Sequence, residues 1–176
     1  MEKSILNFTD NTTNATTVID YSRYKTHVGD HFKAGYQDTD MTAGDKIEIV
    51  FVTPDTSTWA HWSLQAQATG SVVVQLFEGS VLVSNGAAIT RLNRNRNSLN
   101  TSKTLAYHSP TITSDGTKLS EKWVGSEGWR SDISGSFAST NHFLLKQNTT
   151  YLLRLTALSS GIKGGVGGDW SEHSNE

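Results

Sequence analysis

Apolar and polar residues alternate with a period of two along several stretches of this chain, which is typical of half-buried β-strands. The clearest stretch is 59–69, where Ala60, Trp62 and Leu64 face one way and mostly polar residues face the other. The same reasoning predicts further strands at 46–53, 72–77, 81–83, 105–108, 123–124, 141–145, 151–158 and 169–173.

Turn residues separate these strands. Gly70-Ser71 and Glu78-Gly79-Ser80 divide 59–83 into three strands and predict a meander that Asn85-Gly86 ends. The five glycines within 161–168 predict a flexible or tightly turning loop, and polar loops are predicted at 109–120 and 125–136. No amphipathic helix is predicted. Eight to ten short strands without a fixed repeat indicate an all-β protein, an antiparallel β-sandwich with a jelly roll as the favoured arrangement.

Length and composition agree with one domain. The 176 residues match the usual size of a domain, and the chain is 35% hydrophobic and 18% charged. Ser, Thr, Asn and Gly make up much of the rest, and these residues suit strands and turns better than helices. Residues 1–20 are polar and rich in Thr and Asn, so we expect an extended arm there and one sandwich domain over 21–176.

Several classes of function are disfavoured by the same numbers. A net charge of -2 offers no basic field for nucleic acid, and no apolar stretch is long enough to span a membrane. The absence of cysteine excludes thiolate metal sites and thiol nucleophiles. The first six residues lack the apolar region of a signal peptide, so we expect synthesis in a cytoplasm without export.

No metal or cofactor is expected either. Of six histidines, only His27 and His31 have the i, i+4 spacing that is useful on a helix, and Gly29 lies between them in a segment expected to be extended. No Gly-x-Ser-x-Gly motif is present. We therefore expect no enzyme, and a hydrolase whose triad or carboxylate pair assembles only in space is kept as the weakest alternative.

A run of arginine and asparagine is the most unusual local feature. Arg91, Arg94 and Arg96 alternate with Asn93 and Asn95. Guanidinium groups can bind phosphate, but no aromatic residues are interleaved for base stacking. We therefore interpret the run as a hydrogen-bonding network within the domain or at a protein interface.

The five tryptophans are the other candidates. Trp62 lies on the apolar face of its strand and is predicted to be core. Trp59 lies on the opposite face, and Trp123 and Trp129 fall in the loop-rich middle of the chain. These last three are predicted interface residues, at a protein partner or, as stacking platforms, at a glycan.

Several segments together resemble a family of small virion proteins of tailed bacteriophages. The most specific is Asn93-Arg94-Asn95-Arg96-Asn97-Ser98. The complete set, in order along the chain, is 24–32, 53–56 with 59–61, 92–98, 145 with 148–151, and 169–173. The resemblance implies a β-sandwich structural protein of the particle, with a head decoration (cement) protein as the favoured role, and no catalytic residues.

Two main hypotheses follow. The first is a decoration protein that binds the major capsid protein or other virion proteins as a homo-oligomer such as a trimer, in a virion assembled in the host bacterial cytoplasm. Its predicted contact surfaces are the arm 1–20, the run 91–96 and the loops 109–136. The second is a receptor- or carbohydrate-binding module of a tail, collar or head fibre.

Overall fold

The computed structural model describes residues 8–9, 16–17, 21–124 and 137–174. Fifteen strands and one helix lie in these ranges. In chain order they are β1 (Phe8–Thr9), β2 (Thr16–Thr17), α1 (Tyr21–Val28), β3 (His31–Met41), β4 (Lys46–Val52), β5 (Thr58–Ala68), β6 (Val72–Glu78), β7 (Val81–Ser84), β8 (Ala87–Ala88), β9 (Leu92–Asn93), β10 (Leu105–His108), β11 (Thr111–Ser114), β12 (Thr117–Val124), β13 (Phe137–Leu145), β14 (Thr150–Ala157) and β15 (Ile162–Ser174).

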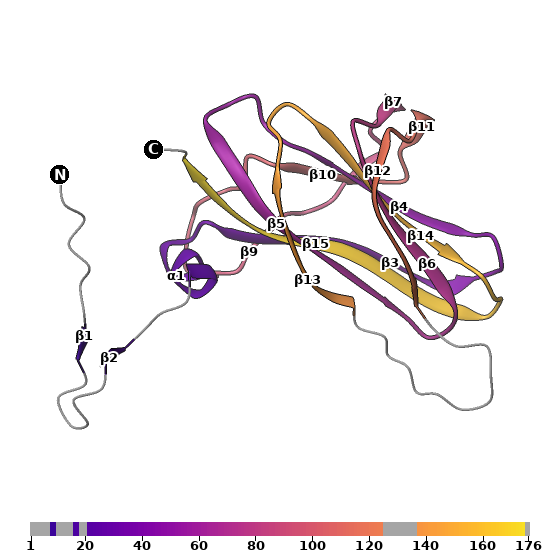
Figure 1. The fold of residues 1–176 in the computed structure, drawn as a ribbon, viewed down its shortest axis with the longest axis horizontal. Helices are drawn as coiled ribbons and strands as arrows, with labels where there is room; N and C mark the ends of the chain where they lie inside the picture. The colour runs from indigo at the N-terminus through magenta and orange to yellow at the C-terminus, as the bar shows by residue number, and fades with distance from the viewer. Residues whose placement is uncertain (1–7, 10–15, 18–20, 125–136, 175–176) are drawn as a thin grey trace.

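Two antiparallel sheets pack face to face, which confirms the predicted all-β sandwich (Figure 1). The six-stranded sheet has the order β12-β6-β14-β4-β10-β8, and the five-stranded sheet has the order β13-β5-β15-β3-β9. Strand β11 pairs with β7, and β1 pairs with β2, in two further two-stranded sheets. Each strand predicted from the alternating pattern has a counterpart among these elements.

Successive long strands lie in different sheets along the chain, except β6 and β12, which pair with each other. Strands β3, β5, β13 and β15 belong to the five-stranded sheet, and β4, β6, β12 and β14 belong to the six-stranded sheet. The predicted meander of 59–83 is therefore wrong, because β5, β6 and β7 lie in three different sheets. Strands β5 and β6 each bury one apolar face, and facing sheets allow these two surfaces to be buried against each other.

Aromatic rings fill the space between the sheets. The Phe51 ring lies 5.3 Å from the Trp62 ring and 5.7 Å from the Trp170 ring, centroid to centroid, with both pairs edge to face. Trp62 is 1% exposed, which confirms its predicted place in the core. Such edge-to-face pairs add to the stabilisation that comes from burying the rings.

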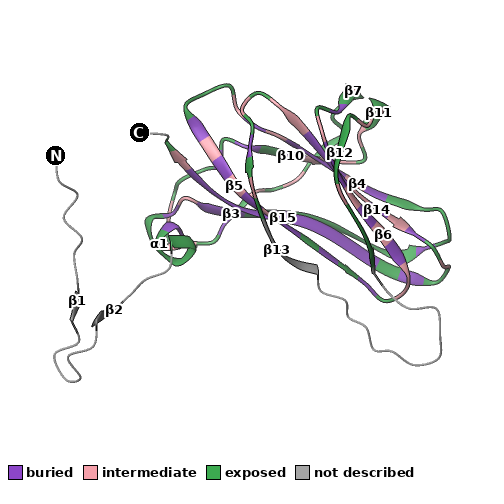
Figure 2. Ribbon diagram, in the orientation of Figure 1, coloured by how far each residue is buried: buried purple, intermediate pink, exposed green. Residues whose placement is uncertain are grey.

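The glycine-rich segment predicted as a loop is part of β15, the central strand of the five-stranded sheet. Most of β15 is buried (Figure 2). A Cβ on Gly168 would lie 2.1 Å from Nε1 of Trp62, and one on Gly164 would lie 2.7 Å from Sδ of Met41. These two inward-facing glycines are needed because large neighbours occupy the space that their side chains would take.

Helix α1 and strand β3 correct the expectation that the segment between His27 and His31 is extended. His27 lies in the helix and His31 begins the strand, so the segment between them is not extended. Gly29 ends the helix with φ +82°, and the amides of Gly29 and Asp30 bond to the carbonyls of Thr26 and Lys25. This is the Schellman arrangement, in which glycine takes the left-handed conformation after the last turn.

The predicted polar loop at 109–120 contains β11 and the start of β12. The loop 125–136 and most of the arm 1–20 lie outside the described residues. In the part of the chain that the structure describes, no helix is long and apolar enough to cross a membrane.

Candidate functional site

The outward face of the five-stranded sheet gathers most of the unusual polar chemistry of the described chain. On β5 the outward positions are Trp59, His61, Ser63, Gln65 and Gln67. The neighbouring outward positions on β15 are Gly165, Gly167, Asp169, Ser171 and His173. Because side chains alternate along a strand, these residues share one face while the core lies beneath them.

A groove of about 610 Å³ crosses this face over strands β3, β15 and β5, with one wall from the segment between β8 and β9. We call it the glycine groove. Its lining residues are Lys33, Ala34, Gly35, Tyr36, Gln37, Gln65, Ala66, Gln67, Thr90, Leu92, Gly165, Val166 and Gly167. Its volume lies within the roughly 300–1,000 Å³ of typical small-molecule sites.

Glycines form the floor of the groove. Gly35 of β3 and Gly167 of β15 are direct cross-strand partners, and Gly165 is the partner of Gln37 and Gln67. A Cβ on Gly167 would lie 2.6 Å from the carbonyl oxygen of Ala34, so this glycine allows a close backbone approach. Without side chains at these positions, the backbone of two paired strands is left at the bottom of the groove.

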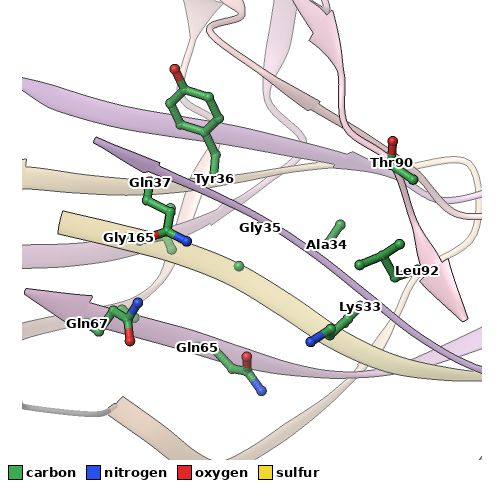
Figure 3. A pocket seen from close by; sticks show the side chains of 13 residues that line it. Lys33, Ala34, Gly35, Tyr36, Gln37, Gln65, Gln67, Thr90, Leu92 and Gly165 are labelled. Atoms are coloured by element: carbon green, nitrogen blue, oxygen red, sulfur yellow. The ribbon is translucent and has the colours of Figure 1, made fainter. Parts of the chain in front are cut away.

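Amide side chains line its two sides. Figure 3 shows Gln65 and Gln67 on β5, on one side of β15, with Gln37 on the other side of the same strand. Lys33 and Leu92 lie farther along β3 and β9, near one end, and are direct cross-strand partners. Within the described ranges, the side chains of Gln37, Gln65 and Gln67 make no hydrogen bond and that of Lys33 no ion pair.

Next to the groove, the same face carries a buried ion pair. Nε2 of His31 lies against Oδ1 of Asp169, and Nη1 of Arg94 donates to Oδ2 of Asp169 at 2.9 Å. Burial of the Asp169 carboxyl opposes its ionisation. The hydrogen bonds and charges of His31 and Arg94 outweigh that effect, so the pKa of Asp169 lies below its ordinary value of 3.8. Asp169 is thus held as a carboxylate in the folded protein.

Three more histidines lie on this face. The His61 and His173 rings are 4.8 Å apart, and Tyr21 of α1 contacts His61 edge to face at 6.2 Å. Burial lowers the pKa of His61 below its ordinary value of 6.5, and the charges of His173, His142 and Lys25 lower it further. His61 is therefore held neutral at neutral pH.

The Ser63–His142 pair is not part of a hydrolase triad among the described residues. Ser63 Oγ lies 2.8 Å from Nδ1 of His142, but the nearby Asp169 pairs with His31 and Arg94 rather than with His142. A triad needs a carboxylate that orients the same histidine that contacts the nucleophile.

A hydroxyl–imidazole–carboxylate chain is present instead at His31, whose Nδ1 lies 2.9 Å from Oγ1 of Thr26 and whose Nε2 lies against Asp169. This histidine is 4% exposed, and the Thr26 hydroxyl donates to the carbonyl oxygen of Ser22 at 3.1 Å. Among the described residues no group of three or more His, Asp or Glu side chains forms a metal site.

The arginine–asparagine run binds back onto the domain. Asn93 Nδ2 donates to the carbonyl oxygen of Gly29 at 2.8 Å, and Asn95 Nδ2 donates to that of His27 at 2.9 Å. These amides satisfy carbonyl groups at the C-terminal end of α1, which have no partner within the helix. The run is thus a network within the domain, one of the two roles predicted for it.

The arginines of the run are less tightly held. Among the described residues, Arg91 and Arg96 make only long contacts, at 3.5 and 3.4 Å, with the carbonyl oxygens of Thr104 and Asn93. The side chain of Arg94 remains 46% exposed although it bonds to Asp169. A contact of these guanidinium groups with a partner protein therefore stays a prediction.

The tryptophan candidates that the structure describes differ in exposure. Trp123 on β12 is 71% exposed, whereas Trp59 is half-buried at one end of β5. Trp129 lies outside the described residues. Neither Trp59 nor Trp123 lines the glycine groove.

The groove itself was not predicted. The alternation of 59–69 already places Gln65 and Gln67 on a polar face, so part of the signal was present in the sequence. Their opposite wall comes from β3, which was not predicted as a strand, and the floor comes from glycines interpreted as a loop.

Comparison with known proteins adds no further assignment: no protein-family model, curated protein or solved structure matches the chain.

Proposed function

We propose that this protein is a non-enzymatic structural protein of a bacteriophage virion, a head decoration protein that binds the assembled capsid and stabilises it. The observation that carries this proposal is the order of the eight long strands. In space they run β3-β15-β5-β13 in one sheet and β4-β14-β6-β12 in the other.

We take this order for a jelly roll. Two four-stranded sheets that exchange successive strands are what two interlocked Greek keys produce, and such double sheets recur in viral capsid proteins and lectins. A fold alone does not establish a function. Here it agrees with the resemblance of 92–98 and the other quoted segments to virion proteins.

An exposed apolar side chain, Leu99, lies next to the arginines on a hydrogen-bonded loop, which supports a protein-binding role. The loop after β9 is held by two local bonds, from the Asn97 amide to Oδ1 of Asn95 and from the Asn100 amide to Oγ of Ser98. Leu99, in this loop, is 96% exposed. An apolar side chain on a loop that is already ordered loses little entropy on binding, which is the behaviour of a good interface anchor.

Stabilisation of a capsid requires no catalysis. A protein that binds only the assembled lattice favours that lattice by mass action, and many copies act together. We therefore expect binding through the 91–96 run with Leu99 and through Trp123, with a homo-oligomer such as a trimer as the binding unit and the major capsid protein as the partner.

The test is to compare phage particles made with and without the gene. Complete particles should contain the protein in many copies, and particles that lack it should release their DNA at a lower temperature. Adding the purified protein back should restore both mass and thermal stability. Equal mass and equal melting of the two kinds of particle would overturn the proposal.

The contact surface is tested by substituting one exposed residue in the proposed contact and one exposed residue elsewhere as a control. Leu99→Asp should leave the thermal midpoint of the free protein unchanged, since exposed substitutions usually alter stability by less than about 0.5 kcal/mol. It should weaken binding to stripped particles at least about tenfold, through loss of an interface anchor. The matched control is Val83→Asp, at another exposed apolar position that is 76% exposed on β7. Equal binding by both variants would exclude the loop as the contact.

A further inference from the structure

We infer that the glycine groove binds an oligosaccharide, with neutral sugar units over the amide-lined floor and room for an acidic unit at the Lys33 end. This site adjoins the 91–96 run assigned to capsid contact and shares Leu92 with it, but its amide-lined floor lies on β3, β15 and β5. It also differs from the site that the sequence indicated for glycan stacking, since neither Trp59 nor Trp123 lines the groove.

The chemistry of the walls suits sugar hydroxyls. Each glutamine amide offers two donor hydrogens and an acceptor oxygen, and a sugar hydroxyl likewise donates and accepts. Gln37, Gln65 and Gln67 converge on the floor from both sides and have no protein partner in the described chain. On the same face, the polar groups of His31, Asp169 and Ser63 are paired within the protein. The groove is thus where this face keeps unused hydrogen-bonding capacity.

Neither steric contacts nor backbone conformation explains why position 165 is a glycine. A Cβ there would meet its nearest atoms, in Gln67 and Gln37, at 3.4 and 3.5 Å, which is ordinary contact. Its backbone is not among those with positive φ. Glycine in a strand interior weakens the strand relative to residues with a side chain. A glycine without a steric or conformational reason, in the floor of a groove, keeps the groove open for a ligand.

The geometry disfavours a polypeptide as the occupant. Peptides that add to a sheet pair with free backbone groups at an edge strand. The floor of the groove is formed by β15 with β3 and β5 on either side, and these strands pair with each other throughout this region. A ligand there can therefore bond only to side chains. The glutamine amides among these side chains suit the hydroxyl groups of a sugar better than the backbone of a peptide.

Charge narrows the ligand class. Among the described lining residues, Lys33 is the one that carries a charge, and none carries a carboxylate. A single ammonium group without an ion-pair partner tolerates neutral sugars and attracts a carboxylate on an acidic unit. One lysine is too little for a nucleic acid, whose binding depends on neutralising several phosphates.

The test is titration of the purified full-length protein with three probes: maltotetraose, N,N′,N″,N‴-tetraacetylchitotetraose and tetragalacturonate. Binding is followed by calorimetry and by chemical shifts of the glutamine side-chain amides. We expect at least one probe to bind more tightly than about 10 mM, with shifts confined to Gln37, Gln65 and Gln67. Lys33→Ala should weaken tetragalacturonate alone.

Two variants separate ligand binding from folding. Gly165→Val should retain or raise the thermal midpoint, since Val suits a strand, while it fills the groove and weakens binding at least about tenfold. Gln67→Ala should weaken binding about three- to tenfold, as expected for loss of a hydrogen bond. The control is Gln75→Ala, on the outer face of the six-stranded sheet, where the glutamine donates to Glu121 at 2.7 Å.

Failure of all three probes to bind, or binding that Gly165→Val leaves unchanged, would overturn the inference. Neither result bears on capsid decoration, because Gly165→Val should bind stripped particles as the unaltered protein does. Loss of capsid binding in Gly165→Val, without sugar binding by the unaltered protein, would instead assign the groove to the capsid contact and likewise overturn the glycan inference.

Discussion

The outer faces of the two sheets differ in whether other parts of the chain cover them. On the six-stranded sheet, Val50, Phe77 and Leu152 form an apolar patch that packs with Leu82, Tyr107 and Ile112. Leu82 and Ile112 come from the β7–β11 pair, which continues β6 and β12. On the five-stranded sheet, the corresponding face is polar and keeps an open groove. The covered face contributes stability, and the open face is the one with room for a ligand.

Ion pairs lie on both outer faces, but among the described residues none of them involves a residue that lines the glycine groove. Arg154 on the six-stranded sheet donates to Glu48 at 2.6 Å and, with two nitrogens, to Asp115 at 2.7 and 2.6 Å. The guanidinium also lies 5.3 Å from the Phe77 ring, so it packs on the apolar patch. On the other face, among the described residues, the side chains of Gln37, Gln65 and Gln67 at the groove make no hydrogen bond and that of Lys33 makes no ion pair. We therefore expect substitutions on the two faces to act on different properties, stability on one and binding on the other.

The largest expected effect is truncation of the covered patch. Leu152 is 0% exposed, so Leu152→Ala leaves a cavity and should lower the free energy of unfolding by about 3 kcal/mol. Gln67→Ala on the open face should change it by less than about 0.5 kcal/mol. Urea denaturation of both variants measures the difference. Similar losses in the two would show that the open face is structural as well.

The next effect compares two glycines of one strand. Gly168→Ala places a Cβ against the Trp62 ring in the core and should cost about 2–3 kcal/mol through overpacking. Gly165→Ala faces the groove and should be neutral or stabilising. Thermal unfolding of the two proteins measures the contrast, and an equally unstable Gly165→Ala would mean that this glycine serves the fold rather than a ligand.

A smaller effect is expected from Arg154→Met, which keeps the packing on Phe77 and removes the ion pairs. The partly exposed carboxylates of Glu48 and Asp115 would lose their partner, at about 1–2 kcal/mol near pH 7. Hydrogen bonding to Arg154 lowers the pKa of Asp115 below 3.8. That contribution is present above pH 3.8 and is lost as the pH falls through the lowered pKa. The stability difference between the two proteins should therefore shrink in acid. A difference that is constant down to pH 2 would contradict this assignment.

The smallest effect concerns His61 on the open face. Since its pKa in the folded protein is below 6.5, the unfolded chain binds the proton more readily, and stability should decline as the pH falls below 6.5 toward the folded value. His61→Gln should flatten this decline without altering the loss near pH 4 that comes from carboxylates. Denaturant melts at several pH values between 2 and 8 measure both. The ring is partly exposed, so the effect should be less than that of Arg154→Met.

How much of the site could be predicted depends on whether the position of each residue follows from neighbouring sequence or from contacts with distant parts of the chain. Gln65 and Gln67 alternate with buried alanines within one strand, so their common face follows from local sequence. Asn93 and Asn95 were expected to form a network, and they do so with carbonyl groups more than 60 positions earlier in the chain. The side chains of Gln37 and Lys33 could not be placed, because most outward residues of β3 are exposed and carry no apolar alternation.

The alternating pattern by itself determined that this chain forms an antiparallel β-sandwich, because burial of every second residue is a local property of a strand. Strand identity at Gly164–Gly168 was decided only by the tertiary structure, since glycine carries no side chain and is therefore missing from any hydrophobic pattern. There the strand is specified by its neighbours: Trp62 and Met41 need the space on one side, and the backbone of β3 approaches closely on the other. The groove has the same origin, because the glycines of its floor carry no side chains that would fill it.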